Sequence, residues 1–423
     1  MRIFALLLLL PSLVFAQRTA PDLRYEDWTY QPNIRSVQFF VDGLYLSYPM
    51  LDLRGSSQLI LTFDDLDGDV KDYTYRIFYC DMDWHPSQLS EMEYLDGFSE
   101  DRITDYQFSF KTISSYTQYR LTLPNNSMRW KMSGNYVLAV FEDEGDFKPV
   151  ITRRFVIVDP KVQISAQMVR PSQVSKFRTH QEIDFTVNHD KMPIRNPRQE
   201  IRAVVLQNGR WDNAITGIVP LYIRTNLLVF DYQDQVVFPG GKEFRQFDIR
   251  SLRFRSPMVA GIESTRDRIS VILNKDRSRE SEPYVEYNDL NGKFVNETQD
   301  QNNPLSSNYS EVLFAFSTAS PFYDDDIYVT GQFSDWQLHD DYRMVYNNAI
   351  NAYVLKVPLK QGFYDYAYAL VPRKAEKKTL NLSPLEGDWF ETENDYTILI
   401  YYKPFGGRAD QVIGMLHFNT RER

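Results

Sequence analysis

The sequence contains very little cysteine: Cys80 is the only one among 423 residues. A single cysteine cannot form an internal disulfide, whereas a secreted eukaryotic protein of this length usually carries several. The chain therefore fits a bacterial periplasm better than a eukaryotic secretory route. Cys80 ends a run rich in aromatic residues, so we expect it to be a packed small hydrophobe rather than a reactive thiol.

Histidine is also scarce, and the usual catalytic motifs are missing. No G-x-S-x-G elbow, P-loop or G-x-G-x-x-G run occurs. None of the histidines has the spacing or the nearby cysteine that metal ligation favours. We therefore expect no catalytic residue, no metal, no cofactor and no enzymatic activity. A carboxylate pair for glycoside hydrolysis stays open, because such partners are distant in sequence. The histidines are His85, His180, His189, His339 and His417.

Positive charge and long apolar runs are limited as well. The net charge of −10 disfavours nucleic acid and anionic membrane surfaces as partners. The run Ile3–Leu10 is shorter than the roughly 20 apolar residues that span a bilayer. Val14 and Ala16 occupy the small-residue positions of a signal-peptidase site, which predicts a signal peptide over residues 1–16. We expect an exported, periplasmic chain that has no membrane span.

Aromatic residues are abundant, with 28 Tyr and 28 Phe, and they alternate with polar residues in short runs. Such residues favour pleated surfaces, and segments with helical periodicity longer than ten residues are almost missing. The pattern predicts an all-β chain of tandem immunoglobulin-like or early-set β-sandwich domains with little helix. We expect an N-terminal sandwich over 17–159, a middle sandwich over 160–318, an early-set sandwich over 319–402 and a tail over 403–423.

The stretch from Leu59 to Phe98 is the most distinctive. Apolar residues alternate over 59–63 and again over 73–79, and the residues between them are mostly turn formers. This pattern predicts two strands of a hairpin around an acidic turn, Asp64–Asp69. A short helical turn is expected after Pro86.

The acidic turn raises the question of calcium. Counted from Asp65, Asp67 and Asp69 fit the alternate acids of an EF-hand loop. The sixth position is Val70 instead of glycine, and the twelfth is Arg76 instead of glutamate, so the loop fails. A solvated turn is the favoured interpretation, and a cation site of another kind stays open.

Two tryptophan-bearing turns are candidates for contact with a partner. Asn208-Gly209 predicts a hairpin tip that carries Arg210 and Trp211, and Arg and Trp are common hot-spot residues. The alternative is that Trp211 packs onto its own sheet. The run Tyr328–Trp336, with Gly362–Tyr368 after it, resembles the early-set modules that bind glycogen.

In those modules the residue matched by Trp336 stacks on sugar, and a basic residue stands where this chain has Ala367. The resemblance supports the fold and weakens sugar binding, so we expect Trp336 to serve structure or protein contact. A periplasmic glycan-binding protein remains the alternative function.

Several long runs resemble the plug protein family of the type IX secretion system of Gram-negative bacteria, in the same order along nearly the whole chain. They are Phe63–Tyr75, Cys80–Phe98, Ser133–Tyr136, Thr152–Phe155, Gln207–Ala214, Phe238–Arg245, Phe247–Leu252, Glu386–Asn394 and Tyr401–Arg408.

The resemblance implies a non-enzymatic periplasmic subunit that docks on the periplasmic opening of the outer-membrane translocon barrel. It would seal the pore when the barrel's lateral gate is not covered by its shuttle partner. No nucleic acid and no small-molecule substrate is expected. The candidate residues for contact with the barrel are Asp65, Asp67, Asp69, Trp84, Arg210, Trp211 and Trp336.

Overall fold

The computed structural model describes residues 23–143 and 148–421. The predicted signal peptide lies outside these residues. Strands dominate, and the helices are single turns, which confirms the expected all-β class of sandwich domains with little helix. The helical turns of the described residues are α1 (Glu91–Tyr94), α2 (Pro197–Glu200), α3 (Ser383–Glu386), η1 (Pro304–Ser306), η2 (Gln332–Ser334) and η3 (Asp340–Tyr342).

The first domain is a sandwich of two main sheets, with strand orders β1-β12-β11-β5-β7 and β2-β4-β9-β8. Its core is unusually aromatic, because rings such as Phe63, Tyr73 and Tyr119 pack together between the sheets. Its strands are β1 (Trp28–Thr29), β2 (Ile34–Val41), β3 (Met50–Asp52), β4 (Leu59–Asp65), β5 (Tyr73–Cys80), β6 (Leu95–Gly97), β7 (Glu100–Ile103), β8 (Asp105–Phe108), β9 (Thr117–Leu123), β10 (Met128–Trp130), β11 (Gly134–Glu142) and β12 (Lys148–Val158).

The predicted hairpin in this domain is wrong. Strand β4 pairs with β2 and β9, whereas β5 pairs with β11 and β7 in the facing sheet. The acidic turn is therefore an arch from one layer of the sandwich to the other. Both strands bury alternate residues toward the same core, so their local patterns are those of hairpin strands, and only the long-range pairing distinguishes the two arrangements.

The second domain is built from two separate parts of the chain. One sheet has the order β13-β14-β18-β17, with β19 beside β14, and the other has the order β16-β15-β29-β30. Its strands are β13 (Gln163–Val169), β14 (His180–Asn188), β15 (Ile201–Gln207), β16 (Ile215–Ile218), β17 (Tyr222–Arg224), β18 (Leu227–Phe230), β19 (Val237–Pro239), β29 (Asp395–Tyr402) and β30 (Gln411–Asn419).

The third domain lies between these two parts in sequence. Its sheets are ordered β20-β28-β23, with β25 beside β28, and β21-β22-β24-β27-β26. Its strands are β20 (Arg245–Asp248), β21 (Val259–Ser264), β22 (Ile269–Leu273), β23 (Phe294–Asn296), β24 (Tyr309–Ser317), β25 (Asp325–Thr330), β26 (Val345–Asn347), β27 (Ala352–Lys360) and β28 (Gly362–Pro372).

The grouping of strands differs from the expected boundaries at 318 and 402. Strands β20 to β24 share the hydrophobic core of β25 to β28. Strand β29 pairs with β15 over seven residues, and β30, in the expected tail, pairs with β29 and closes the second core. Sequence proximity suggested the other grouping, because nothing local in β29 reveals a partner almost two hundred residues earlier.

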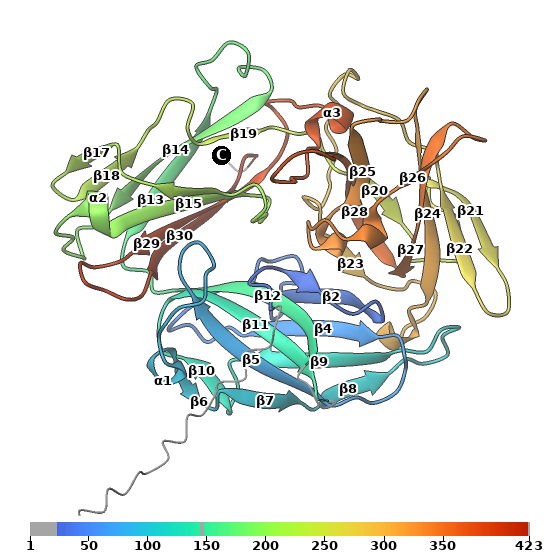
Figure 1. Cartoon of the computed structure of the whole chain (residues 1–423), viewed down its shortest axis with the longest axis horizontal. Helices are drawn as coiled ribbons and strands as arrows, with labels where there is room; N and C mark the ends of the chain where they lie inside the picture. Colours follow the sequence, from blue (N-terminus) through green and yellow to red (C-terminus); the bar gives the residue numbers. More distant parts are fainter. Residues whose placement is uncertain (1–22, 144–147, 422–423) are drawn as a thin grey trace, which may run out of the picture.

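The three domains meet around a common centre (Figure 1). The first domain, in blue and cyan, lies below the second and third. The dark red strands β29 and β30 lie among the green strands of the second domain. A fourth hydrophobic cluster joins residues of the first domain, including Cys80, to residues of the second. Cys80 is buried there, which confirms its expected packing role. Among the described residues, no helix is long and apolar enough to cross a membrane.

Candidate functional site at the junction of the three domains

The acidic turn is organised around one lysine. The Lys71 ammonium lies 3.0 Å from Asp65 Oδ2, pairs with Asp67 and lies 4.0 Å from Asp69. Asp65 is buried and also accepts a hydrogen bond from the Tyr73 hydroxyl at 2.9 Å. Burial raises the pKa of Asp65, but hydrogen bonds from Asp67 N–H and Lys71 outweigh it and hold the pKa below its usual value. The ammonium thus stands where a bound cation would stand.

Of the three candidate aspartates in this turn, Asp67 and Asp69 reach solvent. Their side chains are 54% and 64% exposed, whereas that of Asp65 is fully buried. The expectation that Asp65 contacts a partner is therefore not met in this structure, because its carboxylate is used to hold the arch between β4 and β5. Among the candidate residues of this turn, Asp67 and Asp69 are the two whose carboxylates are accessible from solvent.

The neighbouring Asp64 joins the first domain to the third. Its Oδ2 lies 2.7 Å from Lys360 Nζ and accepts a hydrogen bond of 2.7 Å from the Tyr309 hydroxyl. The side chains of Asp64 and Lys360 are 0% and 2% exposed, so the pair is fully enclosed. The Lys360 ammonium also lies 4.1 Å from the centre of the Tyr116 ring. A buried charge pair with these partners ties the two domains together.

Trp84 joins the first domain to the second. It is buried, and its ring meets Trp211 edge to face at a centroid distance of 4.7 Å. The Arg154 guanidinium lies over both rings, 4.6 Å from Trp84 and 5.9 Å from Trp211. Trp84 belongs to the fourth hydrophobic cluster, and Trp211 packs against this cluster. Trp211 is therefore partly buried in the contact between the second domain and the first.

Arg210 joins the second domain to the third. Its guanidinium forms two hydrogen bonds to the Asp212 carboxylate, at 3.0 and 2.6 Å, and stacks 4.4 Å from the centre of the Trp336 ring. The Trp336 ring also packs against Phe244 and Gly292. A Cβ at Gly292 would lie 2.5 Å from Trp336, so only glycine allows this close approach. The indole that would carry a sugar is thus engaged within the protein.

Arg153 and Asp335 complete the junction between the first and third domains. Arg153 Nη2 lies 2.9 Å from Asp335 Oδ1, and the Thr29 hydroxyl donates to Asp335 Oδ2 at 3.0 Å. Burial raises the pKa of Asp335, and the charge of Arg153 opposes that shift. Neither residue was among the predicted site residues.

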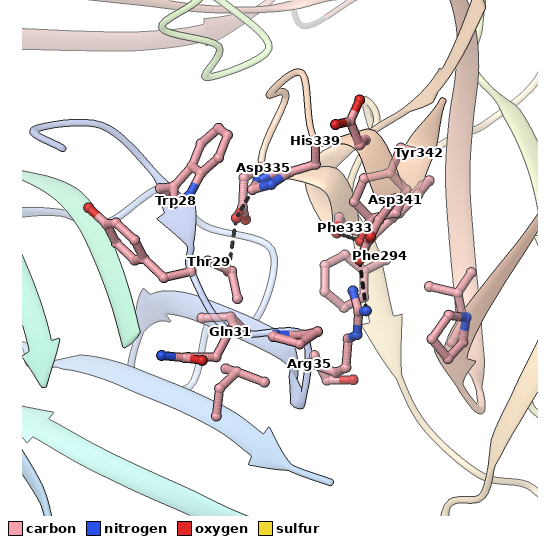
Figure 2. A pocket seen from close by; sticks show the side chains of 18 of the residues that line it. Trp28, Thr29, Gln31, Arg35, Phe294, Phe333, Asp335, His339, Asp341 and Tyr342 are labelled. Carbon is pink, nitrogen blue, oxygen red and sulfur yellow. Dashed lines mark hydrogen bonds and ion pairs between the residues drawn. The ribbon is translucent and has the colours of Figure 1, made fainter. Parts of the chain in front are cut away.

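A cavity of about 210 Å³ opens beside this ion pair (Figure 2). Trp28 of the first domain stacks on His339 of the third at a centroid distance of 3.7 Å. Burial and the nearby Arg153 lower the pKa of His339 to about 4, so this imidazole is neutral at pH 7. Across the cavity, Arg35 donates to Asp341 at 2.9 Å. The first and third domains thus contact each other through rings and charges on both sides of the cavity.

The structure brings the tryptophan and arginine candidates together, while the exposed part of the acidic turn stands apart. Trp84 meets Trp211, and Arg210 meets Trp336. These four residues bind the domains of the chain to one another. The sequence did carry a signal for the missed Arg153: two consecutive arginines interrupt the apolar strand β12, and a buried charge needs a partner.

In the described part of the chain, no group of three or more His, Cys, Asp or Glu side chains is placed to hold a metal ion. Some buried charges instead form pairs between domains, such as Lys360–Asp64 and Arg153–Asp335, and these pairs can fix the position of one domain against another.

Comparison with known proteins identifies the family. Residues 34–159, which run from β2 to the end of β12, match the family model described as type 9 secretion system plug protein 1st domain. The chain belongs to the type 9 secretion system plug protein family. No curated protein matches the chain.

The same fold is present in a solved structure. A crystal structure of a hypothetical protein from Parabacteroides merdae ATCC 43184 is 31% identical and covers 94% of this chain and 100% of its own. Its TM-score of 0.90 means that the likeness extends over all three domains. A crystal structure of a collagen adhesin from S. aureus is 9% identical and covers 90% of this chain and 91% of its own. Its TM-score of 0.10 shows no similarity of fold.

Proposed function

We propose that this chain is a non-enzymatic periplasmic plug that docks on the periplasmic opening of the type IX translocon barrel and seals its pore. The observation that carries the proposal is the junction itself, where buried contacts hold a member of the plug family together as one body. Blocking an aperture requires fixed bulk and an adequate interface, and it requires no chemistry.

The buried ion pairs make that body resistant to opening. Lys360–Asp64 and Arg153–Asp335 both connect the first domain to the third, and each is almost completely enclosed. A shift of one domain against the other would move the charges of each pair out of the one geometry in which they compensate each other inside the protein. A plug under solute flux needs this stiffness, because domains that moved apart would open a path.

The proposed location follows from export. A signal peptide over residues 1–16 would deliver the chain to the periplasm, where a barrel of the outer membrane presents its inner opening. The exposed Asp67 and Asp69 form a negatively charged feature on the first domain, and we place them in the surface that faces the barrel.

The alternative of glycan binding rested on Trp336. Arg210 stacks on this ring at 4.4 Å, and Phe244 contacts it from the third domain at a centroid distance of 5.7 Å. A sugar could stack on Trp336 only after Arg210 had moved away from it. The geometry therefore favours the plug over the glycan-binding protein.

The direct test is co-purification. Affinity-tagged barrel, extracted in mild detergent from cells that lack the shuttle partner, should bring this chain down in a stoichiometric amount, measured by mass spectrometry. Deleting the plug gene in the same cells should raise the uptake of a large hydrophilic dye across the outer membrane. Failure of the barrel to retain the chain, together with unchanged dye uptake, would contradict the proposal.

A further inference from the structure

Strand β8 (Asp105–Phe108) is a free edge of the first domain. It is the last strand in the order β2-β4-β9-β8, and all four of its residues are exposed. Proteins usually protect such an edge with proline, lysine, a bulge or a covering segment, because it can pair with another chain. Strand β8 contains neither proline nor lysine, and its register with β9 is regular.

The backbone pairing shows which groups of β8 face outward. Ser109 N–H donates to Tyr116 C=O at 2.9 Å, in the same register as the β8–β9 pairs. Hydrogen-bonded pairs alternate along an antiparallel ladder. Asp105 and Gln107 therefore bond to β9, and the N–H and C=O groups of Tyr106 and Phe108 point away from the sheet.

The next group in this outward series already has a partner. Phe110 N–H donates to Leu305 C=O of the third domain at 2.8 Å. The edge thus accepts backbone from another segment at one end, where the first and third domains meet. The outward groups of Tyr106 and Phe108 continue that line beyond the end of the contact.

The side chains add an apolar row to this edge. Tyr106 and Phe108 lie on the same face of the strand, with their ring centroids 5.9 Å apart. Tyr106, Phe108 and Phe110 are 40%, 54% and 48% exposed. The Tyr106 ring also lies 5.8 Å from buried Tyr119, so the aromatic core of the sandwich continues onto the surface. Contiguous exposed apolar groups of this kind mark interaction sites.

We propose that β8 is a strand-addition site, at which an extended segment of the translocon barrel pairs with the outward groups of Tyr106 and Phe108. This inference rests on the proposed plug function. The outward N–H and C=O groups of Tyr106 and Phe108 can all be paired only by a partner segment with an extended backbone. The aromatic row requires apolar side chains at alternate positions of the partner. Asp105 is exposed on this edge, so its charge favours a basic residue on the added strand.

One substitution removes an outward donor without touching the ladder to β9. Phe108→Pro deletes the outward N–H, and proline is tolerated on the open side of an edge strand. The double variant Tyr106→Ser/Phe108→Ser keeps the backbone and removes the aromatic row. Phe254→Ser is the matched control, because Phe254 is a 77% exposed phenylalanine of the third domain, outside any strand.

The affinity of the full mature chain for detergent-solubilised barrel is measured by biolayer interferometry. We expect Phe108→Pro and the double variant to bind at least tenfold more weakly, and Phe254→Ser to bind within twofold of the natural chain. Equal binding by both β8 variants, with an unchanged Tm, would overturn strand addition and leave the plug function standing. No binding by the natural chain would overturn both. If Phe108→Pro lowers the Tm, the affinity of the double variant alone is used to test strand addition.

Amide hydrogen exchange provides an independent readout of the backbone. In the free chain, the amides of Tyr106 and Phe108 should exchange quickly and that of Gln107 slowly; barrel binding should slow the first two. The amides of Tyr106 and Phe108 could instead exchange slowly in the chain alone at high concentration, with dimers seen by sedimentation. That result would assign the β8 edge to pairing with a second copy of the chain and overturn the proposal.

Discussion

The two junctions that involve the first domain are built on different principles. Toward the second domain, the contact is an apolar cluster that includes Cys80, Trp84, Leu206 and Tyr401, and Trp211 packs against Trp84. Toward the third domain, the contact combines ring contacts such as Trp28–His339 with enclosed ion pairs such as Lys360–Asp64. Apolar burial tolerates small shifts, whereas a buried ion pair is stable only in one geometry. The difference indicates that the third domain is held in one fixed orientation.

Acidic groups also distinguish the third domain. Burial and the neighbouring Asp289 raise the pKa of Asp365 to about 8, and burial raises the pKa of Asp289 itself to about 6. Asp365 accepts hydrogen bonds from the backbone N–H groups of Leu290 and Gly292 and so fixes the loop beside Lys293. Lys293 faces Asp395 of the second domain at 3.6 Å.

The largest effect is expected from Lys360→Met, which breaks the charged junction. Asp64 would stay buried without its cation, which costs about 3–5 kcal/mol in the free energy of unfolding. Urea unfolding followed by fluorescence measures the loss. The double variant Asp64→Asn/Lys360→Met removes both charges and should recover part of it; no recovery would show that packing, rather than charge, dominates here.

Next in size is Leu206→Ala, which opens a cavity in the apolar junction. Leu206 is fully buried, and such truncations cost about 2–5 kcal/mol. The loss should be the same at pH 5 and pH 8, since no titrating group is removed. A loss in the free energy of unfolding that changed strongly between these two pH values would contradict the distinction between the junctions.

Asp365→Asn tests the pH dependence of the third domain. The folded chain keeps a proton on Asp365 up to about pH 8, whereas the unfolded chain releases it near its ordinary pKa of about 4. The stability contributed by this proton is complete below pH 4 and is lost as the pH rises to about 8. The variant should show a flatter dependence of Tm on pH and a higher relative Tm at pH 8; a variant whose profile matches that of the natural chain would refute the assignment.

The smallest change in stability is expected from Asp67→Asn/Asp69→Asn. Both side chains are more than half exposed, so their pairs with Lys71 should contribute less than about 1 kcal/mol. The same variant tests the proposed surface, since its affinity for the barrel should fall and its salt dependence should weaken. An unchanged affinity for the barrel at low salt would show that the turn is not part of the interface. Asp212→Asn is not a suitable control for the loss of an acidic charge, because Asp212 accepts hydrogen bonds from Arg210.

The sequence was sufficient for the class of fold but not for the pairing of strands. Alternating apolar residues identified β4 and β5, yet the same alternation occurs in a hairpin and in an arch between layers. Strand β29 completes the sheet of the second domain by pairing with β15, and no local pattern in either strand indicates the other as its partner.

The candidate site shows the same limit. The residue types were informative, since Trp84, Arg210, Trp211 and Trp336 all lie at interfaces. Their partners were not predictable, because each contact joins residues from different domains. Arg153 and Asp335 were missed for this reason: their hydrogen bond spans 182 positions of sequence.

The construction of the second domain from two parts of the chain has a consequence for synthesis and export. The third domain is an insertion between β19 and β29, so its two ends are anchored in one sandwich. The first domain can complete its sheets as soon as β12 has emerged, whereas the second must wait for the last strands. A chain cut short before β29 would leave β15 without the strand that pairs with it and would expose apolar surface to proteases. Complete folding of the second domain therefore requires that translation and export have continued through β30.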